Sequence, residues 1–261
     1  MDHRILSSAD GAVGTLTFNY PERHNALSLD MWRASAEALE GFVRDPAIRV
    51  VILTGAGGKA FVSGADIAKF EDERANAVNI ASYNEAVAGF YSVLMNCPKP
   101  TIAMIRGYCI GGGVGIAVCC DMRICNETSR FAVPAAKLGV GYGFEDIRRL
   151  MDLVGPQFVS EILITARQFD AQEALRMGLV NKVVADSEIE SYVSDLAETI
   201  ARNAPLTIQA VKTIVRELLN DPVDRNIGAC DLLVTKCFES ADYQEGRRAF
   251  LEKRKPVFTG R

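Results

Sequence analysis

The stretch Ile110–Cys120, IGGGVGIAVCC, places four glycines at the start of an apolar run. A strand-like segment, TIAMIRGYC over 101–109, leads directly into these glycines, and the apolar residues after them predict a short helix over 113–120. Glycine inside a helix costs about 0.5–1 kcal/mol relative to alanine, so four of them need a reason. Two reasons stay open from the spacing alone. Either Gly115 allows a neighbouring backbone to pack closely, or Gly111–Gly113 leave bare N–H groups at a helix start for an anion or a polarised oxygen.

A second glycine-bearing turn favours the oxygen-binding alternative. The segment GGKAFVSGADIAKF over 57–70 follows an apolar strand-like run, RVVILTG, and also opens a short helix. N–H groups from two such turns can converge on one carbonyl oxygen, which is the arrangement of an oxyanion hole. A nucleotide phosphate site is not indicated, because neither GxxxxGK[ST] nor GxGxxG is present.

Composition excludes several other functions. The chain has 261 residues, a net charge of -4, two histidines and no apolar run close to the about 20 residues of a membrane helix. This balance disfavours nucleic acid as a partner, and it leaves too few histidines for a His-rich zinc site or an ordinary Ser-His-Asp triad. Seven cysteines without CxxC spacing indicate reduced, buried thiols, with Cys109, Cys119 and Cys120 in the core. With no secretion signal at the N-terminus, we expect a cytoplasmic enzyme without a membrane partner.

Strand and helix patterns alternate along the first part of the chain, which predicts an α/β layered fold. Strands are expected within 13–21, 49–55, 99–107 and 121–127, and helices over about 29–43, 75–96 and 113–120, with Ser28 as the N-cap of the first. Beyond residue 186, four helical segments are expected over 186–202, 205–219, 222–240 and 242–254. Their apolar faces require cover from the core or from another subunit.

Taken in order, these segments resemble the crotonase superfamily, the enoyl-CoA hydratase/isomerase family. The resemblance covers nearly the whole chain and rests on PERHNALS (21–28), KAFVSGADI (59–67), GYCIGGGVGIAVCCDMRI (107–124), FAVPAAKLGV (131–140), TARQFDAQEALRMGLVNKVV (165–184) and EGRRAFLEKRKPVF (245–258). It implies a crotonase-like spiral of ββα units over 1–200 and a helical region over 201–261 that mediates trimers, which often pair into hexamers.

The resemblance also implies an acyl-CoA thioester as substrate and no metal or organic cofactor. Ala65 and Gly112 are the implied oxyanion-hole donors. The implied CoA and substrate contacts are Arg23, Asn25, Ala26, Leu27, Lys59, Ala60, Gly64, Asp66, Ile67, Gly111, Ala135, Phe250 and Lys253, the last two from the same or a neighbouring subunit. Asp66 is also expected to cap a helix start and so to orient the Ala65 turn.

The chain departs from the family at two positions. Hydratases of the family carry glutamates at the positions of Gly115 and Ala135, and neither residue here has a side chain that moves a proton. The segment LGVGYGFEDIRRL offers Tyr142 and Glu145 as substitutes, while Asp146 is expected only to favour the start of a helix. Isomerase, decarboxylase and atypical hydratase chemistry stay open, as does a catalytically silent protein that only binds acyl-CoA.

Overall fold

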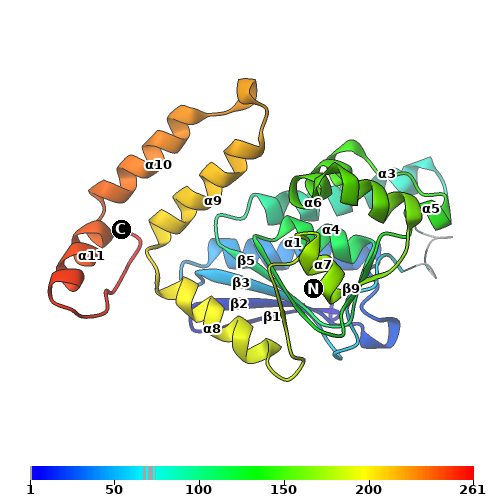
Figure 1. The fold of residues 1–261 in the computed structure, drawn as a ribbon, viewed down its shortest axis with the longest axis horizontal. Coiled ribbons are helices and arrows are strands. Elements are labelled where there is room, and N and C mark those ends of the chain that lie inside the picture. Colours follow the sequence, from blue (N-terminus) through cyan, green and yellow to red (C-terminus); the bar gives the residue numbers. More distant parts are fainter. Residues whose placement is uncertain (1, 67–68, 70–72, 74) are drawn as a thin grey trace.

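The computed structural model describes residues 2–66, 69, 73 and 75–261, and its strands form two sheets (Figure 1). The six-stranded sheet contains, in spatial order, β1 (Ile5–Asp10), β2 (Val13–Phe18), β3 (Val50–Gly55), β5 (Thr101–Ile105), β7 (Met122–Asn126) and β10 (Lys182–Val184). The four-stranded sheet contains β4 (Ala60–Val62), β6 (Tyr108–Ile110), β8 (Arg130–Ala132) and β9 (Phe169–Asp170). All neighbours pair in parallel except β1 with β2 and β8 with β9.

A ββα unit repeats along the chain and explains both sheets. In each repeat one strand joins the larger sheet, the next joins the smaller sheet, and a helix follows: β3, β4 and α3 (Ala77–Met95), then β5, β6 and α4 (Gly112–Cys119), then β7, β8 and α5 (Ala135–Leu138). The predicted spiral of ββα units is therefore present. Each repeat brings the turn after its second strand to the same end of the smaller sheet, which places the two glycine turns close together.

Strand β3 is buried on both faces, as its continuous apolar sequence predicts. Val51 and Leu53 join the main core together with α1 (Leu29–Arg44), α3, α4 and α6 (Phe144–Thr165). Val50 and Ile52 face the other way and pack with α8 (Ile189–Arg202). The predicted N-cap of α1 is confirmed, because the Ser28 hydroxyl accepts a hydrogen bond from the Met31 N–H.

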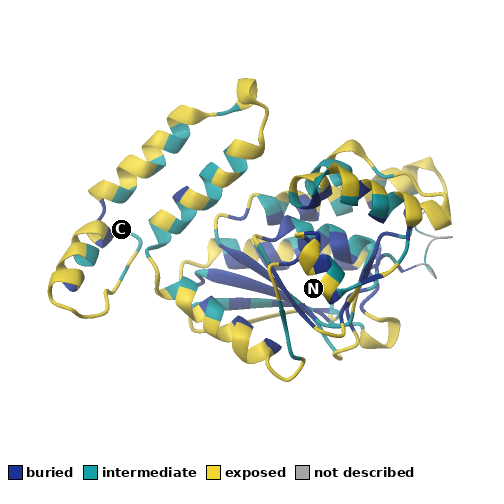
Figure 2. Cartoon of the chain, viewed as in Figure 1, coloured by how far each residue is buried: buried dark blue, intermediate teal, exposed yellow. Residues whose placement is uncertain are grey.

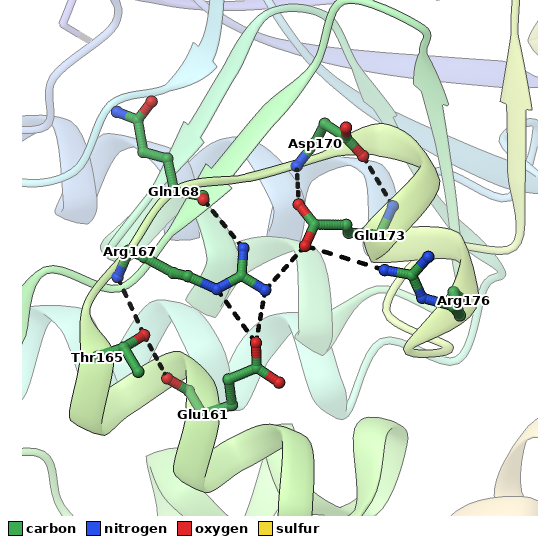
Figure 3. Close-up of polar contacts among 7 residues, drawn as sticks. All are labelled: Glu161, Thr165, Arg167, Gln168, Asp170, Glu173 and Arg176. Atoms are coloured by element: carbon green, nitrogen blue, oxygen red, sulfur yellow. Dashed lines mark hydrogen bonds and ion pairs between the residues drawn. The ribbon is translucent and has the colours of Figure 1, made fainter.

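A cluster of ion pairs fixes the connection between α6 and the smaller sheet (Figure 3). Arg167 donates to Glu161 and to Glu173, and Glu173 also completes a capping box with Asp170 at the start of α7 (Ala171–Arg176). The Arg167 guanidinium lowers the pKa of Glu173. These contacts account for the motif TARQFDAQEALRMG, whose polar residues end one helix and begin the next.

The last three helices extend away from the sheets (Figure 1). They are α9 (Pro205–Leu219), α10 (Ile227–Glu239) and α11 (Ala241–Leu251), and we call residues 205–261 the C-terminal arm. The predicted helix over 222–240 is wrong in its first part, because Pro222–Asp224 forms a short 3-10 turn and the Asn226 side chain caps α10 only from Ile227. Among the described residues, no helix is both long and apolar enough to cross a membrane.

Polar side chains attach the arm to the core. Lys212 on α9 donates to the Asp121 carboxylate at 2.6 Å and to the Lys99 carbonyl oxygen at 2.9 Å. Arg49 reaches the Phe258 carbonyl oxygen at 2.7 Å from the core side. The middle of α9 and the segment near the chain end are therefore fixed, while much of the arm's surface is exposed (Figure 2).

Candidate functional site

The two glycine-bearing turns lie against each other. A Cβ atom built on Gly112 would be 3.9 Å from the Gly64 Cα, and one built on Gly64 would be 4.0 Å from the Gly112 nitrogen. Both turns use backbone conformations that favour glycine, with φ of 105° at Gly64 and 53° at Gly111. The conformation of each turn and their close approach together explain why these positions carry no side chain.

Ala65 and Gly112 supply N–H groups at this contact. Ala65 forms a bridge with Leu27. In that bridge the Leu27 N–H donates to the Gly64 carbonyl oxygen and the Asp66 N–H donates to the Leu27 carbonyl oxygen, so neither bond uses the N–H of Ala65. Gly112 is the first residue of α4, where N–H groups have no intrahelical acceptor and the helix dipole is positive. Ala65, Gly111 and Gly112 all line one cavity of about 170 Å³.

The cavity wall combines apolar residues with polar side chains from α3 and from residues 142–149. Trp32, Val87, Val114 and Val118 are among its apolar residues. Its polar side chains are Tyr83, Asn84, Tyr91, Tyr142, Asp146 and Arg149. A compartment of this kind holds a small apolar chain and presents a few polar groups that fix its orientation.

Tyr142 and Asp146 reach the cavity, and Glu145 does not contribute to its wall. Glu145 is exposed, whereas Asp146 is half-buried and paired with Arg149 one helical turn later. Burial raises the pKa of Tyr142 to about 12, with an added contribution from Asp146. The sequence reasoning missed Asp146 as a cavity residue. The spacing of 146 and 149 contained part of the signal, because positions i and i+3 are neighbours on one helix face.

Tyr91 is a second residue that sequence reasoning missed. It comes from α3, lines the cavity, and is only 6% exposed. Its hydroxyl oxygen would be 2.1 Å from a Cβ atom built on Gly115, so the tyrosine fills the space that a side chain at position 115 would need. Ala135, the other position without a carboxylate, is buried at the start of α5.

The residues around the two turns that are expected to contact CoA differ in their exposure to solvent. Arg23 and Lys59 are exposed near the turns, on the loop after β2 and just before β4. Ala26, Leu27 and Ala60 are buried, and Asp66 is buried beside Ala65. Ile67 lies outside the described residues.

Asn25 has a structural position in this loop. Its side chain is fully buried, accepts from the Tyr20 N–H at 2.8 Å and donates to the carbonyl oxygens of Ala56 and Ala60 at 3.0 and 2.7 Å. The asparagine therefore ties its loop to the β3–β4 connection.

Phe250 lies on α11 and Lys253 follows that helix, both in the C-terminal arm that extends away from the sheets (Figure 1). Phe250 is 83% exposed. Neither residue contributes to the cavity wall, so a contact with ligand would need the arm of a neighbouring copy. No cluster of three or more His, Cys, Asp or Glu side chains able to hold a metal ion occurs in the part of the chain that the structure describes.

Comparison with known proteins identifies the family. The family model described as enoyl-CoA hydratase/isomerase matches residues 8–261. A short-chain-enoyl-CoA hydratase from Clostridium acetobutylicum is 33% identical over 97% of this chain and 96% of its own length. A carnitinyl-CoA dehydratase from Salmonella enteritidis is 35% identical over 100% of both chains. The crystal structure of an enoyl-CoA hydratase/carnithine racemase from Magnetospirillum magneticum superposes with a TM-score of 0.93 at 40% identity, covering 100% of this chain and 97% of the other. The fold, the ordered motifs and these matches together establish that the chain belongs to the enoyl-CoA hydratase/isomerase family and has the crotonase fold.

Proposed function

We propose that this protein processes an acyl-CoA thioester and stabilises an enolate-like thioester oxygen with the N–H groups of Ala65 and Gly112. The observation that carries the proposal is the contact between the two turns at one wall of a partly open cavity lined by apolar and polar residues. Donors fixed in advance at the point where negative charge develops lower the barrier without reorganisation. The names of the relatives support a CoA thioester as the substrate class.

Proton transfer in this site needs groups other than positions 115 and 135. Tyr142 lines the cavity and is one of the two carriers expected from the sequence. Glu145 was the other, and we propose Asp146 in its place, because among the described residues of the cavity wall Asp146 is the only carboxylate. A single carboxylate serves a proton shift along an acyl chain, so isomerase chemistry fits best, followed by decarboxylase or atypical hydratase chemistry.

A catalytically silent acyl-CoA-binding protein is the second candidate. The absence of side chains at Gly115 and Ala135 motivates it, since hydratases of the family act through carboxylates there. The intact Ala65 and Gly112 turns favour the enzyme.

We further propose that the arm mediates a homotrimer or a dimer of trimers in the cytoplasm. Phe250 and Lys253 would then reach CoA from a neighbouring copy. No metal, organic cofactor, nucleic acid or membrane enters this proposal.

Replacing Ala65 by proline tests the oxyanion assignment, because proline removes one N–H group, while glycine at the same position keeps it. We expect Ala65→Pro to lower kcat/KM by about 10²- to 10³-fold and Ala65→Gly to stay near the wild type. Turnover would be followed by mass with a panel of enoyl-, dienoyl- and malonyl-type thioesters, and thermal midpoints would show that both variants fold. Equal kcat/KM in the proline and glycine variants would refute the assignment. Binding of the panel without turnover by the wild type would favour the silent protein.

Hydration of crotonyl-CoA tests our interpretation that Gly115 and Ala135 leave the site without the carboxylates of a hydratase. We expect a rate at least about 10²-fold below that of a relative with two carboxylates, because general acid–base groups typically contribute that much. The measurement is the loss of absorbance of the conjugated double bond by the pure protein. A rate equal to that of such a relative would contradict our proposal that this chain, without carboxylates at positions 115 and 135, is not an efficient hydratase.

A further inference from the structure

Gly115 lies inside α4, and the structure gives a specific reason for this glycine. A Cβ atom at position 115 would be 2.1 Å from the Tyr91 hydroxyl oxygen and 2.8 Å from the ring carbon that carries it. Contacts this short do not occur without movement of one partner. The glycine is therefore required by the tyrosine, whose hydroxyl enters the cavity from α3 at the level of the first turn of α4.

The Tyr91 ring is held firmly on two sides. The indole of Trp32 contacts it edge-on with ring centroids 5.6 Å apart, and the Arg149 guanidinium lies over the ring at 5.3 Å from its centroid. These neighbours come from α1 and α6, so three helices fix the tyrosine. Arg149 is itself held by Asp146. Such a side chain is positioned before any ligand arrives, which is what an active-site group requires.

The Tyr91 hydroxyl has a poor hydrogen-bond partner within the protein. It donates to the Gly112 carbonyl oxygen at 3.5 Å, whereas hydroxyl hydrogen bonds are usually about 2.7–2.8 Å long. A hydroxyl on a side chain that is only 6% exposed normally has a well-formed bond. Burial raises the pKa of Tyr91 well above its usual value, with smaller contributions from Cys119, Tyr142 and Asp146. The hydroxyl thus stays protonated at neutral pH and is available as a donor.

We propose that Tyr91 is a catalytic residue that donates a hydrogen bond to the acyl group of the thioester held by Ala65 and Gly112. This inference rests on the proposed function. The hydroxyl lies 3.5 Å from the carbonyl oxygen of Gly112, one of the two residues that would hold the thioester oxygen, and Tyr91 lines the same cavity, so an acyl group held there would lie beside the hydroxyl. Negative charge that develops on the enolate is then stabilised from a third direction. Tyr91 keeps its proton in this role, and the proton that moves is carried by Asp146 or Tyr142.

The experiment follows α-hydrogen exchange of butyryl-CoA in D₂O by mass, since exchange needs only enolate formation and not a particular overall reaction. Tyr91→Phe removes the hydroxyl alone, and Tyr192→Phe, an exposed tyrosine on α8, is the matched control. We expect Tyr91→Phe to slow exchange about 10- to 100-fold, with the dissociation constant for butyryl-CoA and the thermal midpoint close to those of the wild type. Tyr192→Phe should exchange at the wild-type rate.

Gly115→Ala provides an independent test, because it moves the tyrosine without removing it. The added methyl group should displace the hydroxyl and slow exchange to a similar extent. In the double variant Tyr91→Phe/Gly115→Ala we expect exchange no slower than in Tyr91→Phe alone, because both changes act on the same hydroxyl. Additive losses in the double variant would overturn the proposal.

The outcomes separate this inference from the proposed function. If the wild type fails to bind butyryl-CoA, or binds it without exchange, the proposed enolate chemistry fails and the role of Tyr91 fails with it. If the wild type exchanges and Tyr91→Phe exchanges equally fast, only the role of Tyr91 is wrong. If Tyr91→Phe instead loses butyryl-CoA binding and thermal stability to the same degree as exchange, the residue is structural and the inference is refuted.

Discussion

The sheet core and the C-terminal arm differ in how far their apolar side chains are exposed to solvent (Figure 2). Trp32, Phe61 and Phe131 in the core are at most 1% exposed. On the arm, Leu232 and Phe238 are 64% and 60% exposed. The core therefore buries its apolar surface within one chain, whereas the arm presents a similar kind of surface without cover. Exposed apolar surface of this kind is typical of contact sites, so it supports the proposal that the arm contacts another copy, whereas the core needs only its own chain.

The largest expected contrast comes from one pair of phenylalanines. Phe131 stacks on Phe169 inside the core, and Phe238 contacts Tyr243 edge-on in the arm. Phe131→Ala should lower the free energy of unfolding by about 3–5 kcal/mol, because it leaves a cavity. Phe238→Ala should cost about 1 kcal/mol or less, because its ring is already largely in water. Urea unfolding at low protein concentration measures both. Equal losses would mean that the arm is as tightly packed as the core.

Two glycines, one in the core and one in the arm, should respond to alanine substitution with smaller changes in stability, and these changes should have opposite signs. A Cβ atom on Gly113 would be 2.2 Å from the Val62 carbonyl oxygen, so Gly113→Ala should destabilise the fold by about 1–3 kcal/mol. The nearest atom to a Cβ on Gly228, in the arm helix α10, is 3.9 Å away, and alanine favours helix there. Gly228→Ala should therefore stabilise by about 0.5–1 kcal/mol. Thermal unfolding gives the signs, and the same sign for both variants would contradict the comparison.

Thiol labelling probes the two regions without any change in stability. Cys97, Cys109, Cys119, Cys120 and Cys125 are buried in the core, while Cys230 and Cys237 on the arm are partly exposed. Burial also raises the pKa of Cys119 to about 12, which disfavours the reactive thiolate. Iodoacetamide should label the two arm cysteines at least about tenfold faster than the other five. Mass mapping after a short reaction checks this, and rapid labelling of Cys109 or Cys119 would show that the core opens readily.

The core was more predictable from the sequence than the arm or the cavity wall. Apolar runs such as VVILTG indicate doubly covered strands because they are short, rich in β-branched residues and closed by glycine. The glycine turns at 64 and 111 were also found, because positive φ leaves a local signal. The start of α10 was missed, although Pro222 and the capping side chain of Asn226 gave a usable signal.

Tyr91 was not predictable in the same way. Its contact with Gly115 joins two helices, and nothing local to either residue signals their proximity. Asp146 and Glu145 are adjacent in sequence, so only the rotational phase of α6 decides which of them faces the cavity. The order of strands and helices was therefore predictable from the sequence, whereas the contacts between side chains of different helices, which form the cavity wall, were not.

The space shared by Tyr91 and Gly115 restricts how this sequence can change over evolutionary time. A carboxylate introduced at position 115 alone would collide with the phenol, and loss of the phenol alone would leave a gap beside the bare helix. Conversion between this site and one with a carboxylate on α4 therefore requires paired change on two helices.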